Sequence, residues 1–121
     1  MSAPNIVNVA TITAKSVQAT LNTTLTTEIL ANASSSGKVF KINTIIVANI
    51  DGSSAADASV FITKSGGSPI AIASTISVPA DATLVVIDKN SSLYLEEGDN
   101  IEAGASANSD LTITISYEEL S

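Results

Sequence analysis

Apolar and polar residues alternate along most of the chain, and the alternation is clearest near its end. Leu111, Ile113, Ile115 and Tyr117 are separated by Thr112, Thr114 and Ser116, with Glu118 next. Side chains of a β-strand point to opposite faces with a period of two, so this pattern predicts a half-buried strand over 111–117. We expect Leu111, Ile113 and Ile115 to line its buried face and to pack across a sandwich on Phe40, Ile42 or Leu84.

The same period recurs in short runs throughout the sequence. Residues 17–25 form one strand, or two strands broken near Asn22 and Thr23, while 23–32 has the only pattern that would allow a short helical turn. An opening strand with poorer alternation covers 5–13. The remaining predicted strands cover 38–50, 58–64, 68–78, 82–88, 92–95 and 100–105.

Turn signals separate these runs at intervals of about 8–12 residues, which is typical of β-sandwiches and barrels. The best is Ser65-Gly66-Gly67-Ser68, a hairpin signal. The chain of 121 residues is long enough for one domain. We therefore expect an all-β protein, a single two-sheet sandwich of jelly-roll type over 1–121, with eight or nine short strands. Residues 1–15 are expected to form an N-terminal arm or an edge strand.

Ile45, Ile46 and Val47 interrupt the alternation, because they are consecutive and apolar on both faces of the predicted strand. Such a run belongs in a strand covered on both sides, by a second layer or by a neighbouring subunit. This motivates the prediction of a homo-oligomer with these three residues at its interface. A trimer is favoured by analogy with jelly-roll proteins at three-fold positions of particles.

Composition removes most enzyme chemistry. The chain has no His, Cys, Arg or Trp, and it carries 5 Lys against 12 Asp and Glu for a net charge of −7. A basic surface for nucleic acid is therefore not expected, and neither is an enzyme. No signal or membrane-spanning segment is indicated. Residues 1–80 carry a net charge of +1 and residues 81–121 a net charge of −8, so loops after Ala80 are expected to gather acidity at one pole.

Carboxylates are the remaining candidates for chemistry. Glu96, Glu97 and Asp99 lie close together around Gly98, and Glu102 follows. Paired carboxylates can hydrolyse glycosides, but turn acids usually face solvent and few aromatic residues are present to hold a sugar. Loop oxygens can bind calcium, which makes Glu96, Glu97 and Asp99 weak candidates for metal ligands, although their spacing fits no EF-hand. No catalytic residue and no cofactor is predicted.

Several segments together resemble small β-rich structural proteins of the virions of tailed phages, especially marine and cyanobacterial ones. The similar segments are Gly37–Asn43, Val47–Gly52, Ile76–Ala80, Leu93–Asp99 and Ser116–Glu119. The resemblance implies a virion component made in the host cytoplasm. It favours a capsid decoration (cement) protein on the outer surface that binds the major capsid protein or other virion proteins. The alternatives are a tail, neck or fibre component, and a carbohydrate- or receptor-binding module.

Overall fold

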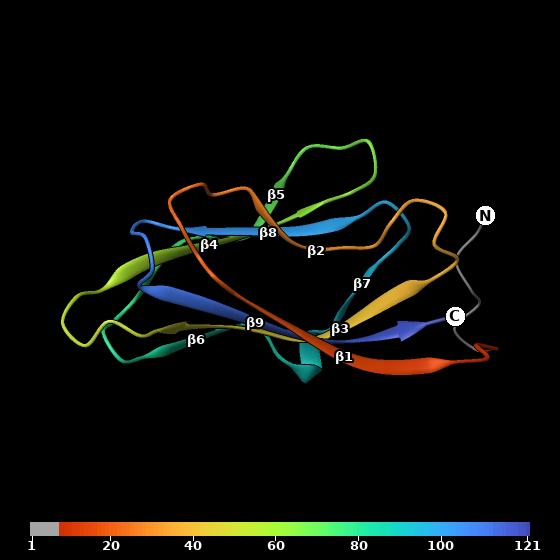
Figure 1. The fold of residues 1–121 in the computed structure, drawn as a ribbon, viewed down its shortest axis with the longest axis horizontal. Coiled ribbons are helices and arrows are strands. Elements are labelled where there is room, and N and C mark those ends of the chain that lie inside the picture. Colours follow the sequence, from red (N-terminus) through yellow and green to blue (C-terminus); the bar gives the residue numbers. More distant parts are fainter. Residues whose placement is uncertain (1–7) are drawn as a thin grey trace.

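A computed structural model describes residues 8–121 of the chain, and within that range it is all-β. No helix there is long and apolar enough to cross a membrane. The strands are packed in two layers (Figure 1). They are β1 (Ile12–Thr20), β2 (Thr27–Ala31), β3 (Val39–Asn49), β4 (Ala56–Thr63), β5 (Ile70–Val78), β6 (Thr83–Ile87), β7 (Leu93–Leu95), β8 (Asn100–Ala105) and β9 (Leu111–Leu120), with a short 3₁₀ helix η1 (Lys89–Ser91).

The order of the strands is that of a jelly roll. Sheet A has the order β1-β9-β3-β6, with β7 also paired to β3, and sheet B has the order β2-β8-β4-β5. Every pairing is antiparallel. One set of pairs is nested, β1 with β9, β2 with β8, β3 with β6 and β7, and β4 with β5, and the pairs β3–β9 and β4–β8 join these hairpins side by side. The chain is thus one long hairpin rolled into two sheets. The predicted two-sheet sandwich is confirmed.

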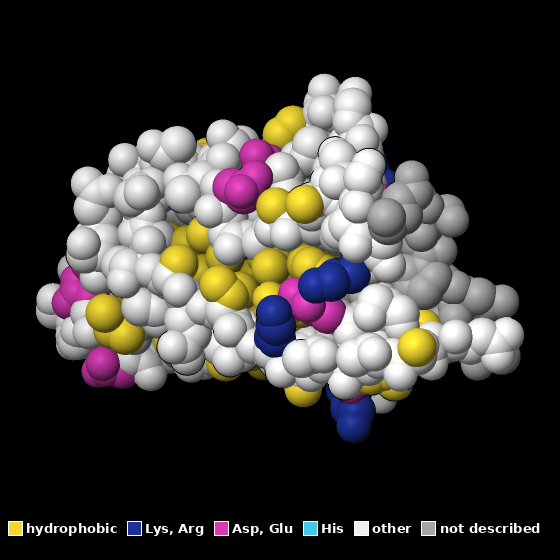
Figure 2. Space-filling model, turned by 45° about the vertical axis from the view of Figure 1, so that its right-hand side comes forward, with side chains coloured by type: hydrophobic (Ala, Val, Ile, Leu, Met, Phe, Trp, Pro, Cys, Tyr) yellow, Lys and Arg dark blue, Asp and Glu magenta, His cyan; other side chains and the backbone are white. Residues whose placement is uncertain are grey.

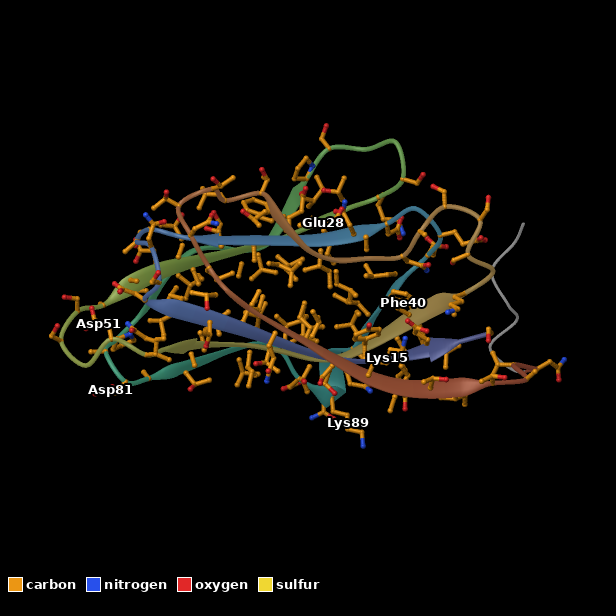
Figure 3. The ribbon with its side chains drawn as sticks, in the orientation of Figure 1. Lys15, Glu28, Phe40, Asp51, Asp81 and Lys89 are labelled. Carbon is orange, nitrogen blue, oxygen red and sulfur yellow. The ribbon has the colours of Figure 1, made fainter. Side chains whose placement is uncertain are left out.

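The core lies between the two layers, where side chains from both sheets meet (Figure 3). Leu111, Ile113 and Ile115 are fully buried, as their alternation predicts. Their predicted partners are misplaced, however. Phe40 and Ile42 belong to β3, which pairs with β9, and Leu84 belongs to β6 on the far side of β3, so all three lie in the same sheet as β9 rather than across from it. The fully buried residues of sheet B that complete the core are Ala58, Val60, Ile101 and Ala103.

The early strands differ from the prediction. β1 ends at Thr20, the following residues form a loop, and β2 occupies Thr27–Ala31 where a helical turn was allowed. The prediction of a helical turn within 23–32 is therefore wrong. Residues 23–32 are rich in β-branched side chains, which suit strands, and β8 offers them an edge with which to pair. Of the expected N-terminal arm or edge strand, residues 12–15 belong to β1 at the edge of sheet A, and residues 1–7 lie outside the described part.

Two buried asparagines join the sheets at opposite ends. Asn32 follows β2 of sheet B, and its amide donates to the carbonyl of Leu95 in sheet A at 3.1 Å and to that of Lys38 at 2.9 Å. Asn49 ends β3 of sheet A, and its amide donates to the carbonyls of Val78 in sheet B and of Ser54, both at 2.9 Å. Each amide therefore ties a carbonyl group of the opposite sheet to one of a neighbouring loop.

Candidate interaction surfaces

The acidic turn between β7 and β8 is organised from within. Asp99 is buried, and its carboxylate accepts hydrogen bonds from the backbone N–H of Glu96 at 2.9 Å and of Ser65 at 3.0 Å. The carboxylate of Glu97 turns away and accepts from the N–H of Gly37 at 2.9 Å, in the loop between β2 and β3. The three sequence-predicted residues thus share one turn, but the carboxylate of Glu97 faces a different neighbour from those of Glu96 and Asp99.

Lys64 supplies the cation of this turn. Its ammonium pairs with the carboxylates of both Asp99 and Glu96, and these two hydrogen-bonded partners, Asp99 foremost, raise the pKa of Lys64 above its ordinary value. A shallow depression of about 350 Å³ lies here, lined by Lys64, Ser65, Glu96, Glu97 and Asp99. An ammonium already occupies the position where a calcium ion would need the oxygens of Glu96 and Asp99, and among residues 8–121 no group of acidic side chains is placed to hold a metal ion.

A second ion cluster was not foreseen from the sequence. Glu119 lies between Lys15 of β1 and Lys38, at 3.2 Å and 3.0 Å from their ammonium groups. Burial pushes the pKa of Glu119 upward, but the hydrogen bonds from Lys38 and Lys15 outweigh it and lower the pKa. Figure 2 shows a hollow floored by hydrophobic side chains, with acidic and basic groups side by side at its margin. The sequence analysis ended this strand at residue 117, whereas β9 continues to Leu120. The continued pairing places Glu119 beside Phe40 of β3, two residues after Tyr117 on the same strand.

The three residues expected at a subunit interface do not share one surface. Ile45 and Val47 are fully buried, because sheet B supplies their second layer. Ile46 alone is on the outer face of sheet A, where it is half-buried and pairs with Val85 of β6. The alternative of a covering layer therefore accounts for two of the three residues. The homotrimer stays a prediction, but it no longer draws on Ile45 and Val47.

The acidic residues after Ala80 are not gathered at one pole, contrary to the expectation. Asp81 lies with Asp51 at one end of the sandwich (Figure 3). The turn of Glu96, Glu97 and Asp99 lies instead against the β4–β5 hairpin, where Lys64 belongs. Folding therefore spreads the acidity of the last third of the chain over the molecule.

The longest uncharged surface segment is the one that leads into and along β5. No charged residue occurs between Lys64 and Asp81. Ile70, Ile72 and Ile76 in this segment are exposed to 65%, 37% and 41%. The gap in charge was readable in the sequence, but its exposure was not, because β5 could equally have been an interior strand.

Comparisons with known proteins assign no role to these surfaces. No protein-family model matches the chain, and no curated protein matches it either.

Proposed function

We propose that this protein is a structural subunit of a phage virion and that it decorates the outer surface of the head. The observation that carries the proposal is the net charge of −7 on a two-sheet sandwich whose acidic side chains lie on several elements. Packed DNA repels such a surface, which suits it to the outer side of a particle. The resemblance of the sequence to small virion proteins supports the same role.

Charge favours the outer side of a head shell. The inner wall of a filled head faces densely packed DNA, a polyanion that repels a domain of this net charge. Acidic side chains lie on several elements, among them Glu28 on β2, Glu102 on β8 and Glu118 on β9. Three of the five lysines, Lys15, Lys38 and Lys64, are paired with carboxylates, which reduces the basic character available for binding DNA.

The proposed benefit is mechanical. A subunit that bridges neighbouring copies of the major capsid protein adds contact area, and that area must be broken before the shell can open under the pressure of its DNA. The sandwich is suited to carry such a load, because hydrogen bonds of Asn32 and Asn49 hold its two sheets together at both ends.

The experiment is to locate and remove the protein in particles. Mass spectrometry of separated heads and tails should find it in heads, at many copies for each shell. Particles that lack it should assemble but release DNA at a lower temperature than complete particles, and adding back the purified protein should restore the difference. Finding it only in tails would favour a tail, neck or fibre component. Its absence from purified particles would reject the virion role.

A further inference from the structure

Within residues 8–121 the two sheets have four edge strands without a second partner, and three of these edges carry features that discourage pairing with another chain. β2 is only five residues long and contains Glu28. The edge made by β6 and β7 is short and is interrupted by η1 with Lys89. β1 directs the charged Lys15 toward Glu119 at the open side of the sandwich. Short edge strands and inward-pointing charges both protect sheet edges.

The fourth edge, β5, is neither short nor charged, although bulges interrupt it. It is nine residues long and uncharged, and it pairs with β4 on one side only within the described chain. Eight of its nine residues are at least partly accessible to solvent, including three isoleucines. An edge of this kind offers backbone N–H and C=O groups together with apolar side chains to an incoming strand.

We propose that a second copy of this chain pairs with β5, antiparallel about a two-fold axis, so that sheet B continues from one copy into the other. A two-fold contact places the same surface of both copies together, so any net charge in it would repel its own image. In a chain of net charge −7, the segment between Lys64 and Asp81 meets that condition. A strongly basic or acidic partner would find no opposite charge there.

Two register shifts interrupt β5, one on each side of Ala73. The register between β4 and β5 shifts between Ala58 and Val60 and again between Val60 and Phe61. Thr75, on the bulged stretch, has a φ of 53°, and its N–H donates to the hydroxyl of Ser59 at 3.0 Å. That amide faces β4 and is not available to a second copy. Ile70 is the most exposed of the three isoleucines and lies outside both shifts, so it should contribute most to the contact.

The full chain alone tests this inference, which does not rest on the virion role. Sedimentation and light scattering across a micromolar concentration series should give twice the chain mass. Ile70→Lys should weaken the dimer by about tenfold or more, because the lysines of two copies would meet. Ile50→Lys is the matched control, since Ile50 is exposed to 61% at the end of the sandwich, next to Asp51. Thermal melts of both variants verify that they fold.

Crosslinking supplies a second measurement. The chain has no cysteine, so one introduced thiol reports on a single position. Of Ala71→Cys and Ile72→Cys, at least one should form an intersubunit disulfide under mild oxidation, while Ile50→Cys should not.

Four results would overturn the inference. They are a monomer throughout the concentration series, a trimer indifferent to Ile70→Lys, equal weakening by Ile50→Lys, or crosslinking at Ile50→Cys alone. A monomer whose Ile70→Lys variant no longer binds shells would assign the same edge to the capsid protein instead.

Discussion

Replacing Asn49 by alanine tests whether the two sheets are held together at their ends by side-chain amides. Asn49 is buried, with an exposed fraction of 3%, and its side chain makes three hydrogen bonds. Its amide donates to the carbonyls of Ser54 and Val78, and its carbonyl oxygen accepts from the N–H of Asp51 at 2.8 Å. Alanine removes all three bonds and leaves their partners in place.

The cost follows from where those partners lie. Val78 is buried, so its carbonyl should bear the full penalty of an unpaired group, about 1–3 kcal/mol. Ser54 is exposed and Asp51 is half-buried, so water can replace part of their bonds, at about 0.5–1 kcal/mol each. The expected loss in the free energy of unfolding is therefore about 3 kcal/mol. For a chain of this length, an unfolding entropy of about 2 cal/mol/K per residue converts that loss into a decrease in Tm of about 12 °C.

Thermal and urea unfolding followed by circular dichroism measure both quantities. Asn90→Ala is the control, because Asn90 is exposed in η1, and its Tm should stay within about 2 °C of wild type. Asn49→Asp should be worse than Asn49→Ala, because it sets a carboxylate against the carbonyl oxygens of Ser54 and Val78. A loss below about 1 kcal/mol for Asn49→Ala, or an aspartate variant more stable than the alanine variant, would refute the reasoning.

Four further predictions follow from the core and the ion clusters. Ile113→Asp buries an unpaired charge at a fully buried position and should yield insoluble protein, whereas Thr112→Asp on the opposite face should express as soluble protein; equal solubility would contradict the alternation of β9. Lys64 has a pKa raised by Asp99 and Glu96, so its contribution to stability is complete below its ordinary pKa of 10.5 and is lost as pH rises through the higher folded-state value. Denaturation by urea at alkaline pH should therefore show a smaller pH dependence in Lys64→Met than in wild type. Glu119 has a lowered pKa, so its contribution is present above its ordinary pKa of 4.5 and is lost as pH falls through the lower folded-state value; Glu119→Gln should flatten the acid limb of a plot of Tm against pH. Millimolar calcium should leave Tm unchanged, since Lys64 already engages Glu96 and Asp99, and a rise in Tm that Asp99→Asn abolishes would show the opposite.

The sequence predicts the strands well wherever one face of the strand is buried and the other is not. β9 is the best example, because the alternation of Leu111, Ile113 and Ile115 with threonines records the boundary between core and surface directly. The end of that strand was placed too early, since Glu118 and Glu119 are adjacent acids with no apolar residue between them. The structure continues pairing to Leu120, and this shift is what brings Glu119 to Lys15 and Lys38.

The sequence could not show which strands are neighbours. Phe40, Ile42 and Leu84 were predicted to pack on β9 from across the sandwich, but all three lie in the same sheet as β9, because pairing between strands far apart in the chain leaves no local pattern. Ile45 and Val47 illustrate the same limit. A run that is apolar on both faces looks identical whether a second sheet or a second subunit covers it.

Charge in this protein restricts how copies can meet. A net charge of −7 makes most contacts between two copies repulsive, and the acids lie at the Asp51–Asp81 end, in the Glu96–Asp99 turn and on the outer strands, so few orientations escape that repulsion. Three of the five lysines that could offset it, Lys15, Lys38 and Lys64, are held in pairs by carboxylates of the same chain. What remains for self-contact is the uncharged length of β5, where apolar side chains and free backbone groups coincide. A surface that repels copies everywhere except along one edge would give the protein a defined contact, and it would leave the rest of the acidic surface facing solvent on the outside of a particle.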